Sequence, residues 1–171
     1  MERPDFDKLP GFYDEIPYPW DKKDELLTIF SDFEIEIHNA EDPDFEFQDE
    51  RGISLIIKNP YGGYDIEIEM DAEFSLFFAG WHTHYFTYEY DYHQMIEGAK
   101  DIIAGRRFVA FLNRNGEWYG SSLEDKPITL DEFLNRRKDD PICPYTDEQI
   151  AEIKNAELDF QLRYWKQETD T

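Results

Sequence analysis

Apolar and polar side chains alternate along much of residues 33–86, and this period of two is typical of half-buried β-strands. In the clearest case, Ile66, Ile68 and Met70 are separated by Glu67 and Glu69. Other segments of strand character are bounded by turn residues and span residues 33–38, 45–48, 53–57, 74–78 and 81–86. Because no helical pattern separates these segments, they predict an antiparallel meander.

Residues 91–105 change to the spacing of three and four residues that marks an amphipathic helix. Its apolar positions are Tyr92, Met95, Ile96, Ala99, Ile102 and Ile103. Gly105 suits the position just after the last turn of this helix. A strand over residues 108–112 follows, and Asn115-Gly116 predicts a tight turn into a partner strand over residues 118–121.

Three further helices are expected from capping signals and apolar spacing. A short helix lies within residues 21–33, and a second begins at its cap Thr129. Thr146 and Gln149 form a capping box, and the apolar positions beyond it predict a C-terminal helix over residues 146–168.

These elements place the chain in the α+β class, with an antiparallel sheet of roughly five to seven strands and helices on one face. A length of 171 residues fits a single domain spanning residues 1–171. The chain contains 14 Phe, 11 Tyr and 4 Trp, so its core is expected to be rich in aromatic rings.

Residues 1–20 combine prolines with large apolar side chains, and the prolines exclude a regular helix. One interpretation is an arm that packs on the domain, and the alternative is an exposed peptide that awaits a partner. Exposed rings reduce solubility, which favours the packed arm.

The charge balance is strongly acidic, with 40 Asp and Glu against 17 Lys and Arg and a net charge of −23. Such a field repels the phosphates of nucleic acids and anionic membranes, and it attracts basic proteins. We therefore expect a basic protein partner and neither nucleic acid nor membrane. Solubility alone is the alternative explanation of this charge.

The compartment is expected to be the cytoplasm. Cys143 is the single cysteine, so the chain has no internal disulfide and suits a reducing environment. The first residues lack the basic and apolar regions of a signal peptide, and no window approaches the ~18 apolar residues that a membrane span needs.

Three of the four histidines are candidates for a metal site. On a strand, His82 and His84 point to the same side, and with His93 they would suit zinc or iron. Their spacing matches no established zinc signature, and histidines of aromatic strands commonly fill half-buried positions. We therefore expect no cofactor, and a small metal-dependent hydrolase that uses these histidines is an alternative. Glu67 and Glu69 are expected to lie on a solvated strand face.

Residues 77–123 combine an apolar strand, Trp81-His82-Thr83-His84, an amphipathic helix that ends near Gly105, and a hairpin that ends Gly116-Glu117-Trp118-Tyr119-Gly120-Ser121. This order resembles small bacterial cytoplasmic domains of the toxin-immunity type. The resemblance implies a protein that acts by binding, and it transfers no catalytic residues.

The leading hypothesis is an acidic cytoplasmic binding protein, specifically an immunity protein that inhibits a basic toxin such as a nuclease. The expected partner-binding residues are four acids and two rings, namely Asp42, Asp44, Glu46, Asp49, Tyr61 and Tyr64. A structural or regulatory homodimer formed through the C-terminal helix is an alternative, and the sequence leaves the oligomeric state open.

Overall fold

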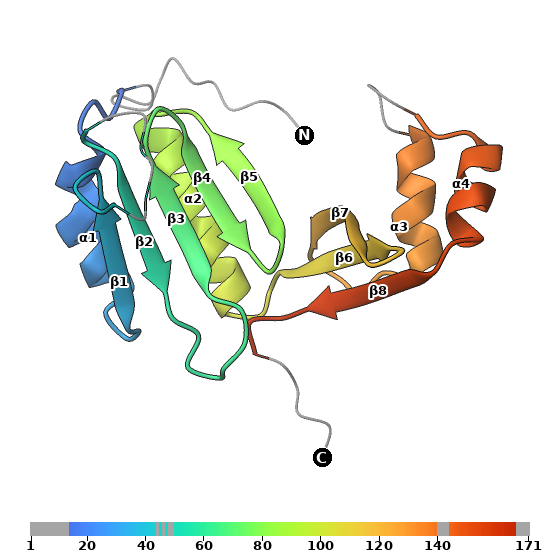
Figure 1. Cartoon of the computed structure of the whole chain (residues 1–171). Helices are drawn as coiled ribbons and strands as arrows, with labels where there is room; N and C mark the ends of the chain where they lie inside the picture. The colour runs from blue at the N-terminus through green and yellow to red at the C-terminus, as the bar shows by residue number, and fades with distance from the viewer. Residues whose placement is uncertain (1–13, 44, 46, 48–49, 140–143, 167–171) are drawn as a thin grey trace, which may run out of the picture.

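The computed structural model describes residues 14–43, 45, 47, 50–139 and 144–166. It contains antiparallel sheets and α-helices, so the predicted α+β class is confirmed (Figure 1). The strands divide into one sheet of five and another of three, whereas the sequence pattern predicted a single sheet. Among the described residues, no helix has the length and apolar character that crossing a bilayer requires.

The first sheet is an antiparallel meander in which neighbours along the chain are also neighbours in space. Its strands in order are β1 (Ile35–Asn39), β2 (Ile53–Ile57), β3 (Ile66–Met70), β4 (Phe74–Phe78) and β5 (Trp81–Tyr85). On β3 the predicted alternation holds, because its three apolar side chains are fully buried and its two glutamates lie half-buried on the other face. Ala79 and Gly80, both at positive φ, make the two-residue turn between β4 and β5.

Two helices cover one face of the first sheet (Figure 1). The longer one, α2 (Glu89–Ile103), buries side chains at the predicted spacing, namely Tyr92, Met95, Ile96, Ala99 and Ile102. The other, α1 (Lys23–Ile29), follows the 3-10 turn η2 (Pro19–Lys22) and buries Leu26 in the same core. No described helix lies on the opposite face of this sheet, although Ser54 and Ser75 on that face are buried.

The second sheet has the order β7-β6-β8 and carries its own apolar cluster. Its strands are β6 (Phe108–Arg114), β7 (Glu117–Glu124) and β8 (Leu158–Arg163), and its helices are α3 (Leu130–Arg136), the 3-10 turn η3 (Arg137–Asp139) and α4 (Asp147–Lys154). The predicted turn between β6 and β7 forms at Asn115 and Gly116, both at positive φ. Phe133 and Ile153 bring α3 and α4 into the cluster.

The C-terminal helix predicted over residues 146–168 is wrong. The predicted capping box forms, but α4 ends at Lys154 and the chain then becomes β8. Leu158, Phe160 and Leu162 pack against the second core with a period of two. Antiparallel pairing with β6 supplies the hydrogen bonds that select a strand over a longer helix.

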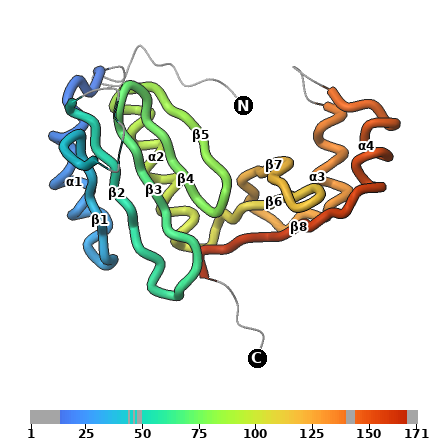
Figure 2. Tube along the Cα trace, in the orientation of Figure 1, coloured from blue at the N-terminus to red at the C-terminus, as the bar shows by residue number. Residues whose placement is uncertain are grey.

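After β8 the chain returns to the first sheet (Figure 2), and Trp165 lies in the core of that sheet. The Trp165 side chain is only 1% exposed and contacts the rings of Phe33 and Phe78. Its carbonyl oxygen accepts a hydrogen bond from Nδ2 of Asn59 at 2.7 Å, and the same Nδ2 donates to the carbonyl of Tyr64. The second sheet is therefore anchored to the first at both ends.

The described end of the N-terminal arm lies beside the start of α2. Ile16 is buried, and its amide donates to the carbonyl of Thr87 at 2.7 Å. Glu15 forms an isolated antiparallel bridge with Tyr88. Residues 1–13 of the predicted arm lie outside the described residues.

Candidate binding face

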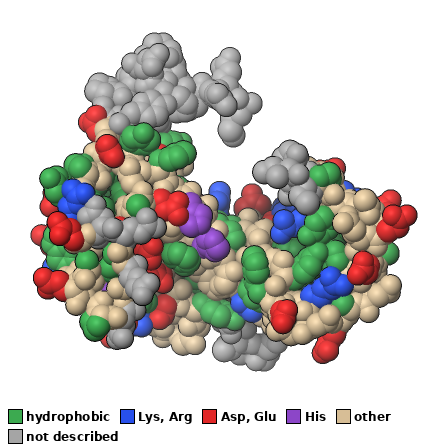
Figure 3. Space-filling view, turned by 45° about the horizontal axis from the view of Figure 1, so that its top comes forward, with side chains coloured by type: hydrophobic (Ala, Val, Ile, Leu, Met, Phe, Trp, Pro, Cys, Tyr) green, Lys and Arg blue, Asp and Glu red, His purple; other side chains and the backbone are tan. Residues whose placement is uncertain are grey.

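The face of the first sheet opposite α1 and α2, here called the open face, consists of the strand residues that alternate with the core positions. The antiparallel register arranges them in two rows across the five strands. One row contains Glu36, Ile56, Glu67, Phe77 and His82, and the other contains His38, Ser54, Glu69, Ser75 and His84. In the space-filling view, histidine side chains reach the surface beside acidic side chains (Figure 3).

Both histidines of β5 are exposed on the open face. Nδ1 of His84 lies 2.9 Å from Oγ of Ser75 and 3.1 Å from Oε1 of Glu73. The centre of the His82 ring lies 5.0 Å from that of His84 and 5.5 Å from that of Phe77. The two imidazoles therefore already have polar and aromatic neighbours on this face.

Two carboxylates lie near the middle of the open face without an ion pair to any described lysine or arginine. Glu67 accepts a hydrogen bond from Oγ of Ser54 at 2.7 Å, and Glu69 has no hydrogen bond or ion pair to any described residue. Burial raises the pKa of Glu69, repulsion by the carboxylates of Glu67, Asp71 and Glu73 raises it further, and the nearby His84 offsets a smaller part of this rise. The fold thus holds negative charge at a position where that charge is unfavourable.

Replacing Glu69 with glutamine is expected to stabilise the protein at neutral pH. The raised pKa means that the folded chain binds the Glu69 proton more tightly than the unfolded chain, so ionisation of Glu69 destabilises the fold as the pH rises. Relief of the like-charge repulsion should contribute about 0.5 kcal/mol, or ~1–2 °C in melting temperature. Thermal melts at about pH 7.5 should show this gain, and melts at about pH 4 should not, because the carboxyl is then mostly protonated.

The control for this prediction is Glu157→Gln, which removes an exposed carboxylate elsewhere on the chain. The control should leave the melting temperature within ~1 °C of the wild type at both pH values. The explanation would be contradicted if the control raised the melting temperature equally, or if the rise for Glu69→Gln persisted at about pH 4, because neither result would come from the ionisation of Glu69.

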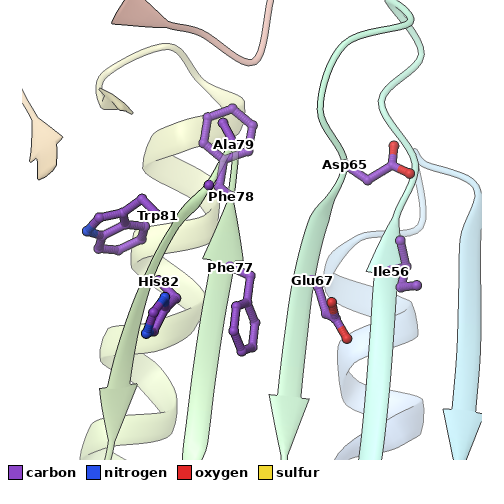
Figure 4. A pocket seen from close by; sticks show the side chains of 9 residues that line it. Ile56, Asp65, Glu67, Phe77, Phe78, Ala79, Trp81 and His82 are labelled. Atoms are coloured by element: carbon purple, nitrogen blue, oxygen red, sulfur yellow. The ribbon is translucent and has the colours of Figure 1, made fainter. Parts of the chain in front are cut away.

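A hollow of about 280 Å³ lies at the end of the open face near the β4–β5 turn (Figure 4). Ile56 and Phe77 contribute apolar surface to its wall, and Asp65 and Glu67 contribute carboxylates. Lys58 pairs with Asp65 at 3.2 Å, whereas Glu67 has no cation within 4 Å among the described residues. Apolar surface beside a free carboxylate suits the aliphatic stem and charged head of a lysine or arginine side chain.

The structure brings His82 and His84 together but places His93 elsewhere. His93 lies on α2, which covers the other face of the sheet, and its Nε2 lies 3.9 Å from Oε2 of Glu89. Within the described residues, no group of three or more His, Cys, Asp or Glu side chains has the geometry of a metal site. The predicted three-histidine cluster therefore does not form in this structure.

Of the four acids predicted to bind a partner, Asp42 is described. Its Oδ2 lies 2.6 Å from Nδ1 of His38, and the His38 ring stacks on Phe45 at 3.8 Å between ring centres. This contact places Asp42 at the β1 edge of the open face. The other three acids, Asp44, Glu46 and Asp49, lie outside the described residues.

The two predicted ring anchors are exposed, Tyr61 by 59% and Tyr64 by 37%. Neither residue belongs to the two rows of the open face, and each ring lies beside a cation of β8 or of the residues after it. Lys166 Nζ lies 5.2 Å from the centre of the Tyr61 ring, and the guanidinium of Arg163 lies 5.0 Å from that of Tyr64. The charged groups beside the two rings are therefore cations, whereas Asp42 lies beside His38.

The open-face residues that sequence reasoning did not select are Glu67, Glu69, Ile56 and Phe77. In the sequence, the two glutamates have the pattern of an ordinary solvated strand face, and Phe77 belongs to the apolar run of β4. The available signal was Phe77 itself, because alternation from the buried Phe74 and Leu76 assigns Phe77 to the polar side of the sheet. A phenylalanine on that side marks apolar surface among charges.

Comparison of the chain with protein-family models, with curated proteins and with solved structures finds no match.

Proposed function

We propose that the protein binds a basic protein partner through the open face of its first sheet, as an immunity protein does when it blocks a basic toxin such as a nuclease. The observation that carries this proposal is the pair Glu67 and Glu69, which lie side by side without a lysine or arginine partner among the described residues. A basic partner would supply the missing cations and remove the repulsion that raises the pKa of Glu69.

The hollow beside these carboxylates gives the proposal a specific contact. Its wall includes Phe77 and Ile56, so an arginine or lysine side chain that reaches Glu67 would also bury apolar surface. Interfaces gain most of their affinity from a few such anchored side chains, and surrounding charges mainly increase the association rate. The net charge of −23 would increase the rate of association with a basic partner.

The proposal predicts that Glu67→Gln combined with Glu69→Gln weakens binding of an oligo-arginine peptide about tenfold, which corresponds to ~1.4 kcal/mol. Titration calorimetry at about 0.05 M NaCl measures the affinity, and raising the salt to about 0.5 M should weaken it further. The matched control, Glu148→Gln combined with Glu157→Gln, removes the same charge from exposed positions outside the open face. It should change the affinity less than about twofold.

Equal weakening in the two double variants would mean that the peptide responds to net charge alone, and would contradict a site on the open face. With a protein partner in hand, the immunity mechanism requires a 1:1 complex in which the activity of the partner is inhibited. Association should slow steeply as salt is added. Binding that does not depend on salt would contradict the electrostatic basis of the proposal.

A further inference from the structure

A cavity of about 880 Å³ lies between the end of α2 and β8. Figure 2 shows β8 running back from α4 to the end of α2. The residues that line the cavity are Tyr64, Ile103, Ala104, Gly105, Gln161, Leu162, Arg163, Tyr164 and Lys166. This volume is within the range of small-molecule sites. None of these residues is an acid, although 40 of the 171 residues of the chain are Asp or Glu.

Arg163 faces this cavity with most of its donors unused. Its Nε donates to Oε1 of Gln161 at 3.0 Å, and its Nη1 donates to the carbonyl of Ala79 at 2.8 Å. A guanidinium has five N–H donors, and the remaining donors have no acceptor among the described residues. The guanidinium also lies 3.3 Å from the centre of the Phe111 ring, which holds its plane in place. The cation is therefore preorganised and unpaired.

A second unpaired cation and several rings complete the lining. Lys166 makes no ion pair with any described residue, and its Nζ lies over the exposed ring of Tyr61. Tyr64 lies beside the guanidinium of Arg163, and Tyr164 packs against Phe108 in a tilted arrangement with 4.5 Å between ring centres. The tyrosine rings and the cations of Arg163 and Lys166 therefore border the same cavity.

The end of α2 contributes apolar side chains without a strong negative field. The amides of Arg106 and Arg107 both donate to the carbonyl of Asp101, and Gly105 at φ 71° makes the turn that allows this. Because this bonding satisfies a carbonyl of the last turn, it reduces the repulsion that a helix C-terminus would exert on an anion. Ile103 and Ala104 remain as the apolar part of the lining.

We propose that this cavity binds a small organic anion with a flat apolar body. The anionic group would pair with Arg163 and Lys166, and the flat body would lie against the tyrosine rings and the end of α2. The lining of this cavity shares no residue with the hollow on the open face, although Nη1 of Arg163 donates to the carbonyl of Ala79 at the edge of that hollow.

The probe for this proposal is 1-anilinonaphthalene-8-sulfonate, which combines a sulfonate with flat rings and fluoresces when it is shielded from water. Titration of the full chain should show saturable binding.

Lys166→Glu should raise the dissociation constant of the probe at least tenfold, because it replaces an attractive charge with a repulsive one. Ala104→Trp should have a similar effect without any change of charge, since the exposed Ala104 lies at the cavity and its replacement would fill the space. The matched control Lys126→Glu makes the same charge change on an exposed loop and should alter the dissociation constant less than twofold.

Competition then identifies the chemical class of the anion. Displacement of the probe by adenosine 5′-monophosphate supports the proposal with a phosphate, and displacement by indole-3-acetate supports it with a carboxylate. The proposal is overturned if neither compound displaces the probe, or if Lys166→Glu and Ala104→Trp bind it as tightly as the wild type. Neither result bears on the oligo-arginine experiment, because that experiment concerns residues of the open face.

Discussion

Trp165→Ala is expected to lower the free energy of unfolding by about 4 kcal/mol, the loss typical of a fully buried large aromatic side chain. The Trp165 side chain is 1% exposed and contacts Phe33 and Phe78 within the first core. Its removal would leave a cavity and would also loosen the carbonyl that accepts the hydrogen bond from Asn59. Urea denaturation followed by far-ultraviolet circular dichroism measures the change.

Two variants test whether this loss comes from the core position. Trp118 is 61% exposed at the β6–β7 hairpin, so Trp118→Ala should change the stability by less than ~0.5 kcal/mol. Trp165→Phe keeps an aromatic ring and should recover about half of the loss. A loss below ~1 kcal/mol in Trp165→Ala would contradict the insertion of this side chain into the first core.

Arg136→Met is expected to lower the free energy of unfolding by about 3 kcal/mol, because it leaves a buried carboxylate without its cation. Glu124, at the end of β7, is 4% exposed. Its two carboxylate oxygens accept hydrogen bonds from Nη1 of Arg136 on α3 at 2.6 and 2.7 Å, and Oγ of Ser122 donates at 2.7 Å. The pair therefore joins α3 to the second sheet. Thermal melts and urea titrations both report the loss.

The double variant Glu124→Leu with Arg136→Met distinguishes two contributions to the free energy of unfolding: the contribution of the ion pair itself and the destabilisation caused by an unpaired buried carboxylate. With both charges removed, the stability should return to within ~1 kcal/mol of the wild type. Arg106→Met is the surface control, because its partner Asp101 is 29% exposed whereas Glu124 is 4% exposed, and this variant should lose under ~1 kcal/mol. A double variant as unstable as Arg136→Met alone would contradict this explanation.

The first sheet was predictable because its sequence pattern and its burial have the same period. Ile66, Ile68 and Met70 alternate with glutamates, and this alternation matches a sheet with one covered and one uncovered face. The turn between β6 and β7 was also predictable, because Asn115-Gly116 forms the tight turn that this dipeptide favours. Local signals decide such elements before any long-range contact is made.

The second sheet was harder to predict because β8 satisfies two periods at once. Ile153, Phe160 and Tyr164 fall at helical spacing, whereas Leu158, Phe160 and Leu162 alternate as in a strand. The choice depends on pairing with β6, which lies more than forty residues earlier in the chain. Tertiary contacts override local propensity in such segments, and no local pattern reveals the partner strand.

The candidate site was predictable only in part, for a similar reason. The acidity of the chain and the same-side placement of His82 and His84 follow from the sequence. The register that sets Glu67 opposite both Ile56 and Phe77 does not, because it depends on three strands pairing in one order. Without the register, Glu67 and Glu69 cannot be distinguished from the other acids of the chain.

The return of Trp165 to the first core has a consequence for how the chain folds during synthesis. Ribosomes make β1 to β5 and α2 first, but the core that these elements share lacks one of its largest side chains until Trp165 has been made. The whole second sheet is synthesised between α2 and Trp165. Its strands must pair before the end of α2 and Trp165 can come close together. The sheet that begins to form first is therefore the last to be completed, and nascent chains that stop before Trp165 should remain open to proteases and chaperones.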